Sequence, residues 1–584
     1  MIVDMKKISI LTQAKDAGSA LKTLGRAGVL HIEHQQAPKS EDVSVLEEKH
    51  RAISEAIALL PDSAEQDTGI AETDFLVSEI LRIFDEKETI LEDVKSIGKI
   101  IGEWKEWGDF DPELIGEMEN KGLSARLCKL IKTNIPELPK DVILEEISRK
   151  NKVSYCVVIS RKDEPLPFKT LDLPDKSLGE MIALRDQEEE RLKTVNIKLQ
   201  KLAVYKNVLY SDKKRLEFLI EFNKALAGKG DFGRISCLKG YLPVHKVDFL
   251  ERLAAEEKWG LLIENPAEGD KVPTLIKNPR WVEIIKPVFN IIKTLPGYKE
   301  VDISFWFLIF FSVFFGMLIG DAGYGVLFLL ANIFCHVKFA KKVPDRSVFF
   351  LIYVLAGCAI IWGALTGTFF GQAWLSQRIK PLMPFLRTDK NVQAICFYIG
   401  AFHLSIAHAW KFIRKMPSLK AFSEIGWIFI LWAAYFLARL LILGEIFPYQ
   451  AKWLFASGSA LIVLCTNPSR NIFKTIASGA GSLLMNIINS FTDIVSYIRL
   501  FAVGTATVAV ADAFNQMAAG IGHGNFFAGF FTALILLLGH TLNIALGAMA
   551  ILVHGVRLNV LEFSSHLNME WSGIEYSPFR GKGD

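Results

Sequence analysis

The chain has 584 residues, of which 51% are apolar, 22% charged and 11% aromatic, and its formal net charge is +3. This length and near-neutral balance exclude a small scaffold and a polyanion-binding protein, so nucleic acid is not an expected partner. Charge is concentrated in residues 1–300, whereas residues 303–567 contain many apolar runs of membrane-spanning length, about 20 residues each. The composition therefore predicts a soluble domain followed by a polytopic membrane domain.

Short predicted strands and helices alternate at both ends of the soluble part. This alternation is typical of one or two small α/β lobes, and we assign residues 1–265 to a cytoplasmic α+β arm. The expected strands lie at 7–12, 29–34, 153–160, 235–242 and 260–264, and the expected helices at 16–27 and 245–258.

Two long helical stretches, near 42–108 and 176–226, separate the predicted lobes. Apolar residues from Leu76 to Trp104 recur at alternating spacings of three and four, which predicts a coiled-coil stripe. We expect the helix at 42–60 to be its partner, with a turn over 61–73. Two interpretations stay open: a solvated hairpin that only holds two lobes apart, or a strut whose far lobe binds a partner.

No catalytic signature is present in the soluble part. The sequence contains no GxxxxGK[ST] phosphate loop, no HExxH, no zinc-binding cysteine cluster and no GxSxG, and GKGDFG at 228–233 is interpreted as a loop. None of the seven cysteines forms a CxxC pair, which predicts free, reduced thiols in a cytoplasmic compartment. The N-terminus shows no signal-peptide pattern, so the first membrane helix is expected to direct insertion.

The remaining chain is predicted to be a proline-rich linker at the membrane surface (266–302), an α-helical membrane domain (303–567) and a cytoplasmic tail (568–584). A turn containing Gly320, Asp321, Gly323 and Gly325 separates the first two spans and is interpreted as structural. Lys and Arg are richer in the loops 338–346, 411–420 and 466–474 than in the outer connections, which places both termini inside. The eight predicted spans lie near 303–319, 321–337, 347–371, 391–411, 421–443, 451–465, 481–517 and 525–567.

Arg499 lies near the middle of the seventh predicted span. An Arg at the centre of a membrane helix costs roughly 2.5–3.5 kcal/mol on insertion scales, which favours a functional role. The small residues Gly504, Ala506 and Ala509 would let another helix approach closely. A fixed positive charge on such a face could attract a carboxylate on a moving partner. The alternative is a static pair with a carboxylate of the chain, such as Asp493 or Glu424.

The last predicted span carries a polar stripe in an otherwise apolar helix. His540 and His554 are fourteen residues apart and are predicted to share one face, with Asn543 and Arg557 three residues beyond each. Such a stripe must face protein or water. Arg557 could instead extend to the membrane surface. Further along, Glu562 and His566 could form an interfacial pair. The polar span residues outside this stripe, among them Glu424, His403 and His408, could line water access or be satisfied interface residues.

With these motifs the chain resembles subunit a, called subunit I in prokaryotes, of the V-type and archaeal-type rotary ATPases. The resemblance implies a membrane stator beside a rotating proteolipid ring (built of K/c subunits), with two aqueous half-channels that carry H⁺ or Na⁺. It matches Arg499 to the essential Arg, Arg557 to a second Arg, and His554 and Glu562 to polar positions nearby. It also implies that Gly504, Ala506 and Ala509 pack closely against the ring. The stretches that carry it are VPTLIKNPRW (272–281), GMLIGDAGYG (316–325), SYIRLFAVG (496–504), GHTLNIALGAM (539–549) and VHGVRLNVLEF (553–563).

The resemblance also implies partners and a location. The arm would bind the peripheral-stalk subunits E and G/H, and the C/d socket of the central stalk is a further candidate. The chain would lie in the lipid of a bacterial or archaeal cell membrane, with ATP chemistry and cofactors left to other subunits. Gly547 stands where some relatives carry a carboxylate, so His540, Asn543 and Glu424 are the candidates for that half-channel duty.

Two other classes of function compete with this one. A self-contained secondary transporter usually shows an internal repeat among its spans, and none is evident here. A membrane-anchored coiled-coil scaffold would make Arg499 dispensable, and the deep Arg and the polar stripe count against it.

Overall fold

The computed structural model describes residues 1–62, 72–131, 142–150, 153–161, 170–171, 173–343, 345–372, 378, 380–468, 470–521 and 525–580. The chain divides into two compact units, one of residues 1–9 and 240–578 and the other of residues 10–239 and 579–584. Most of the predicted turn at 61–73 and the end of the predicted tail lie outside the described residues.

Four of the five expected strands belong to one five-stranded sheet, in the order β2-β8-β1-β9. The predicted helices are also present, as α1 (Ala17–Ala27) and α7 (Val247–Glu256). The segment 228–233 is more than the predicted loop, because β7 (Gly230–Asp231) pairs with β8. The strands of the sheet are β1 (Met5–Gln13), β2 (His31–Glu33), β8 (Ile235–Pro243) and β9 (Gly260–Glu264).

A second sheet has the strand order β4-β5-β3-β6, in which β6 is Thr170–Leu171, and α4 (Pro112–Asn120) precedes it. Only β5 (Val153–Arg161) was predicted, and the charged residues of its neighbours β3 (Leu123–Ile131) and β4 (Ile143–Lys150) concealed their alternation. Cys128 lies opposite Cys156 across β3 and β5, and both are free and buried. Burial raises the pKa of the Cys128 thiol to about 11, so this thiol stays protonated at neutral pH.

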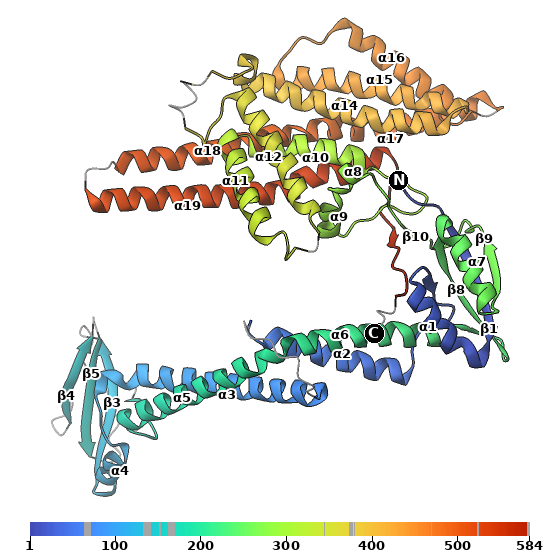
Figure 1. Ribbon diagram of the computed structural model, residues 1–584. Helices are drawn as coiled ribbons and strands as arrows, with labels where there is room; N and C mark the ends of the chain where they lie inside the picture. The colour runs from blue at the N-terminus through green and yellow to red at the C-terminus, as the bar shows by residue number, and fades with distance from the viewer. Residues whose placement is uncertain are drawn as a thin grey trace. The chain divides into compact units, whose positions relative to one another are not determined.

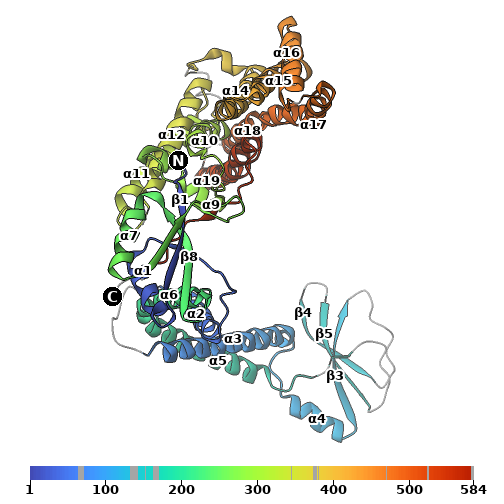
Figure 2. The same ribbon diagram turned by 90° about the vertical axis from the view of Figure 1, so that its right-hand side faces the viewer.

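Four helices form the arm (Figures 1 and 2): α2 (Glu41–Leu59), α3 (Thr73–Trp104), α5 (Leu178–Leu202) and α6 (Lys206–Ala227). The sequence predicted that the helix at 42–60 is the partner of the apolar stripe on α3. This prediction is wrong, because each of the two helices packs mainly on another helix. Helix α3 packs chiefly on α5, and α2 packs chiefly on α6. The chain leaves through α2 and α3 and returns through α5 and α6, so each outgoing helix lies beside a returning one. Leu76, Ile80 and Ile83 are buried in this seam together with Val195 and Leu199.

Replacing Ile80, which is fully buried, tests this seam. We expect Ile80→Ala to destabilise the arm by about 2–5 kcal/mol, because a cavity replaces the contacts of its side chain. Ile100→Ala is the matched control on the same helix, 38% exposed, with an expected effect within about 0.5 kcal/mol. Hydrogen exchange of α3 and α5 in the full-length protein measures both. Equal exchange in the two variants would contradict the assigned seam.

Helices occupy all of the predicted membrane positions, but the count of eight spans is not confirmed. Within the described residues, six helical segments are long and apolar enough to cross a membrane. Helix α10 has 16 residues and α16 has 17, and both are shorter than those six. The helices are α10 (Ser304–Ile319), α11 (Ala322–Phe339), α12 (Ser347–Thr366), α14 (Asp389–Lys415), α15 (Phe422–Ala438), α16 (Tyr449–Cys465), α17 (Ile472–Ser496), α18 (Ile498–Ile521) and α19 (Phe526–Ala550).

The predicted linker at 266–302 belongs to the compact unit that also contains the apolar helices, and it has secondary structure of its own. It holds α8 (Arg280–Glu283), α9 (Lys286–Ile292) and β10 (Pro273–Thr274). Strand β10 pairs in parallel with β11 (Ile574–Glu575), so the C-terminal segment is held against it. The five prolines indicated a linker, but the proline pattern alone gives no information on this long-range pairing.

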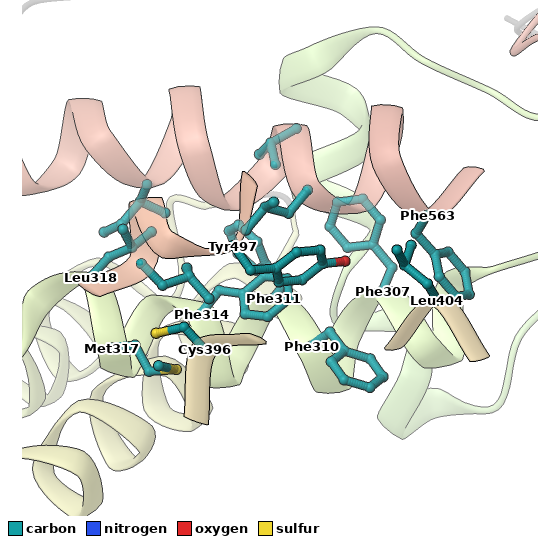
Figure 3. Close-up of a cluster of buried hydrophobic side chains, with 14 of the residues drawn as sticks. Phe307, Phe310, Phe311, Phe314, Met317, Leu318, Cys396, Leu404, Tyr497 and Phe563 are labelled. Atoms are coloured by element: carbon teal, nitrogen blue, oxygen red, sulfur yellow. The ribbon is translucent and has the colours of Figure 1, made fainter. Parts of the chain in front are cut away.

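Aromatic side chains of α10 form the centre of the membrane core (Figure 3). Figure 3 shows Phe307, Phe311 and Phe314 around the ring of Tyr497, which is fully buried. The imidazole of His403 is stacked between Phe310 and Phe563, with ring centroids 3.8 and 4.2 Å apart. These contacts fix the chain at Tyr497, where α17 ends and α18 begins.

Asp321 caps α11 in the turn between α10 and α11. Its Oδ1 accepts hydrogen bonds from the backbone N–H groups of Gly323 (2.7 Å) and Tyr324 (3.2 Å), and its Oδ2 accepts one from Gly371 (2.9 Å). Gly320 has φ = 67°, a left-handed conformation that glycine adopts without strain. The turn therefore depends on one fully buried carboxylate.

Asp321→Ala should destabilise this turn strongly. Each buried N–H left without an acceptor costs about 1–3 kcal/mol, so the thermal unfolding midpoint of the purified complex should fall. Asp345→Ala is the matched control, because the exposed Asp345 precedes α12 and its Oδ1 accepts a hydrogen bond from the backbone N–H of Ser347 (2.9 Å). Its expected cost is about 1 kcal/mol. A fall no larger than in the control would show that the turn does not depend on Asp321.

Candidate functional site

The junction between α17 and α18 positions Arg499. The hydroxyl of Tyr497 lies 2.8 Å from Nδ1 of His403 on α14, and no room remains beside the Tyr497 ring for a side chain at Gly400. Arg499 follows one half-turn later, and its Nε donates to the carbonyl oxygen of Ser496 (2.9 Å). The guanidinium is thereby held close to a break in the helix, on a side chain that is 22% exposed.

Three of the predicted site residues lie together: the guanidinium groups of Arg499 and Arg557 both contact the carboxylate of Glu562. Arg499 Nη2 donates to Glu562 Oε1 at 2.5 Å, and Arg557 Nε lies 3.4 Å from the same oxygen. Arg499 is therefore paired with a carboxylate of its own chain, as the static alternative expected, but the carboxylate is that of Glu562 and not of Asp493 or Glu424. The predicted pairing of Glu562 with His566 is also wrong, because both side chains are engaged with other helices.

The three charges of this cluster do not cancel. Glu562 is 6% exposed and its Oε2 has no hydrogen-bond partner among the described residues. A buried carboxylate is stable only when it is paired, and two guanidinium groups meet that need. One net positive charge remains, on a cluster whose Arg499 is still partly accessible. Such a cluster can attract a second carboxylate from outside the chain.

The predicted alignment of His540 and His554 on one α-helical face fails beyond Ala550. Two π-helical segments, η8 (Ile551–Gly555) and η9 (Leu558–Phe563), follow α19 and shift the register of every later residue. His554 Nδ1 is buried without a hydrogen-bond partner in the described part of the chain. The spacing of apolar residues does not indicate where a π-helical turn will form, so the sequence could not predict this change of helical register.

His540 and Asn543 belong to a separate group around Tyr324 of α11. The Tyr324 hydroxyl lies 2.7 Å from His540 Nδ1 and accepts from Asn543 Nδ2 (3.0 Å). Asn543 also donates to the carbonyl oxygen of Thr507 on α18 (3.0 Å). This group ties α11, α18 and α19 together and contains neither Arg499 nor Arg557.

Glu424 lies in a third group. It contains His408, which the sequence marked as polar, and Lys411 and Lys415, which were assigned to the loop 411–420 but lie on α14. The Oε2 atom of Glu424 is 2.6 Å from His408 Nδ1, and its Oε1 accepts from Lys415, with Lys411 3.7 Å away. His408, Lys411 and Lys415 are spaced three and four apart on α14, which is the one signal that could have placed them on a common face. Glu424 itself is 3% exposed.

The small residues predicted to pack against a ring do not share one face. Gly504 is buried, and any side chain there would collide with the carbonyl oxygen of Met317 on α10. Its smallness therefore serves packing inside the chain, which corrects the prediction. Ala506 and Ala509 are exposed on the opposite face of α18, which runs side by side with α19 (Figure 1).

Two cavities adjoin the helices that carry Arg499, one on each side of it along the chain. A cavity of about 360 Å³ is lined on α17 by Asn486, Asn489, Ser490 and Asp493, which precede Arg499. A cavity of about 610 Å³ is lined on α18 by Thr505, Ala509 and Asp512 among others, which follow it. The first is markedly polar, and the second places Asp512 near the ends of α12 and α14.

Curated relatives match the chain over nearly its whole length. V-type ATP synthase subunit I of Borreliella burgdorferi is 32% identical, with 99% of each chain covered. V-type ATP synthase subunit I 1 of Treponema pallidum is 29% identical over 99% of this chain and 100% of that protein. A-type ATP synthase subunit I of Methanocaldococcus jannaschii is 26% identical over 71% of this chain and 64% of that protein.

No protein-family model matches the chain. A crystal structure of the cytoplasmic N-terminal domain of subunit I, homolog of subunit a, of V-ATPase covers 44% of this chain and 99% of that one at 12% identity, but its TM-score of 0.22 is too low to compare folds. The whole-length match at 32% identity, together with the motifs around Arg499 and Glu562, shows that this membrane protein belongs to the family of V-type and A-type ATP synthase subunit I.

Proposed function

We propose that this chain is the membrane stator that carries ions past the rotating ring of a V/A-type ATPase, and that Arg499 separates two half-channels. The observation that carries the proposal is that Arg499 follows, along the chain, the α17 residues that line the cavity of about 360 Å³ and precedes the α18 residues that line the cavity of about 610 Å³. A charge held between two offset water-filled paths lets an ion leave the ring on one side and enter on the other, but blocks direct passage.

The electrostatics of the cluster support this role. An opposite charge favours the ionised form of a carboxylate, so a ring carboxyl that reaches Arg499 should release its ion. The guanidinium has five N–H donors, and the contacts to Ser496 and Glu562 use two of them. Glu562 thus orients Arg499 and leaves donor capacity for the incoming carboxylate. The exposed face of Ala502, Ala506 and Ala509 on α18 would let a ring helix approach.

The rest of the chain fits the same role. The proposal includes eight spans with both termini in the cytoplasm, as the basic loops favour. The arm would bind the peripheral stalk and resist torque, and it carries no phosphate-binding loop, which supports a non-catalytic role within the complex. The proposed partners are the proteolipid ring, the stalk subunits E and G/H, and the C/d socket of the central stalk.

Arg499→Ala should abolish ATP-driven ion uptake into membrane vesicles that carry the whole complex, while the complex still assembles. Arg499→Lys should restore little of it, because Lys is a hydrated point charge without the planar fork that matches a carboxylate. Arg439→Ala is the matched control, an Arg at the end of α15 whose partner Glu445 lies outside the cluster. It should leave uptake near the native rate. Native uptake in Arg499→Ala would contradict the proposed function.

A further inference from the structure

A third cavity, of about 660 Å³, lies within the unit that contains the apolar helices. Its walls are formed by β10, α8, α9, the first residue of α10 and β11. It shares no lining residue with the two cavities near Arg499. Its volume is within the range of about 300–1,000 Å³ that is typical of ligand-binding sites. The chain therefore has a ligand-sized space that the proposed ion path does not use.

Four charged side chains line this cavity, two of each sign, and all four are exposed. They are Glu283, Lys286, Lys293 and Glu575. Among the described residues none of the four forms an ion pair, although opposite charges line the same space. The pKa of Asp345 is lowered by hydrogen bonds from Ser347 and, to a smaller extent, by the charge of Lys286, so Lys286 lies near the start of α12. The cavity thus offers both acidic and basic groups to a ligand that carries both charges.

Two hydroxyl groups in the wall have no hydrogen-bond partner in the part of the chain that the structure describes. Thr274 is 1% exposed, and its Oγ1 and that of Thr294 are both buried and unpaired. Buried hydroxyls in proteins are nearly always hydrogen-bonded, so an unpaired one points to a missing partner. The backbone of Thr274 is held by β11, because the N–H of Tyr576 donates to the Thr274 carbonyl oxygen (3.1 Å). A ligand with acceptor oxygens in the cavity would supply the partner.

The helices that form this cavity also carry apolar side chains typical of a membrane surface. Trp281 on α8 is 57% exposed and packs edge-on against Phe305 of α10, with ring centroids 5.5 Å apart. Ile291 on α9 is 66% exposed. Trp is enriched where a membrane meets water, because its ring is apolar and its N–H is polar. Ser304, the first residue of α10, lines the cavity, so the cavity lies where an apolar helix begins.

We propose that this cavity binds the headgroup of a phospholipid that carries a primary ammonium, of which phosphatidylethanolamine is the simplest. Lys286 and Lys293 hold the phosphate, and the unpaired hydroxyl of Thr274 donates to it. Glu283 and Glu575 accept hydrogen bonds from the ammonium. Apolar lining residues contact the glycerol and the first methylene groups, and they are Leu275, Ile276, Ile285, Phe289 and Leu295. This inference goes beyond the proposed function and does not depend on the role of Arg499.

The balance of charge in the cavity selects among headgroups. An anionic phospholipid without an amine would leave both carboxylates facing a negative charge. A quaternary ammonium has no N–H and cannot donate to Glu283 or Glu575, whereas a primary ammonium has three donors. A soluble phosphoethanolamine carries the same two charges, but it has no methylene groups to place against the apolar lining.

Photolabelling of the whole purified complex in phosphatidylcholine vesicles tests the site. The probe is phosphatidylethanolamine with a photoreactive acyl chain, and mass spectrometry measures saturable labelling of residues 272–304. Unlabelled phosphatidylethanolamine should compete about tenfold better than phosphatidylcholine or phosphatidylglycerol. The double variant Lys286→Gln, Lys293→Gln should lower the labelling about tenfold, because two charge-assisted contacts are lost. Lys271→Gln is the control, an exposed lysine of the same segment that does not line the cavity, and it should stay within about twofold of the native labelling.

The double variant Glu283→Gln, Glu575→Gln tests the selectivity, including the case in which the lysine variant fails to assemble. It should remove the preference for phosphatidylethanolamine over phosphatidylglycerol, and a retained preference would overturn the assignment of the ammonium. Equal competition by the three lipids in the native complex, or native labelling in an assembled lysine variant, would overturn the site. Equal protection by soluble glycerophosphoethanolamine would overturn the assignment to a lipid.

Discussion

The structure of the membrane part depends on the need to keep one guanidinium in an apolar bundle without neutralising it. Glu562 alone would cancel the charge of Arg499, but Arg557 shares the same carboxylate oxygen and leaves the cluster net positive. The aromatic packing of Tyr497 and His403 fixes the backbone immediately before Arg499, and a buried glycine at 504 brings α18 against α10 immediately after it. The break in the helix lies directly before Arg499, and the two π-helical segments lie in the backbone that carries Arg557 and Glu562.

The two cavities differ in their lining. The cavity on α17 is lined mainly by hydroxyl, amide, carboxylate, imidazole and ammonium groups. The cavity on α18 has a mostly apolar lining, to which Arg387, Asp389 and Asp512 add charges and three threonines add hydroxyls. A structural ion pair would need no water-sized path on either side. The exposed face of α18 carries only small side chains near Arg499, so a partner helix could reach the guanidinium without rearrangement of the core.

The sequence predicted the parts of the fold that local patterns encode. The lobe elements and the apolar stripe of α3 follow from periods of two and of about three and a half. The residues of the central cluster, Arg499, Arg557 and Glu562, were found because charges are rare in spans. Local patterns could not predict that α3 pairs with α5, or that β3 and β4 flank β5, because those contacts join distant segments.

The same limit applies to the site. His566 meets Asp493 across 73 residues and His408 across 158, and no spacing rule connects such positions. The π-helical segments after α19 displaced the expected polar face, and the buried position of Gly504 removed it from the expected ring contact. A composition of small residues shows that something packs closely, but only the fold shows whether the neighbour is another subunit or the chain itself.

The central claim is that the face of α18 beside Arg499 meets the ring helix that carries the ion-binding carboxylate. Cysteine cross-linking in the assembled complex tests it directly, with Ala506→Cys on the exposed face and Ala511→Cys as a buried control on the same helix. The account predicts that a cysteine at 506 cross-links to one beside the ring carboxylate and stops ATP-driven ion uptake until the bond is reduced, whereas one at 511 does neither. Absence of the cross-link at 506 in a fully assembled complex would contradict the account.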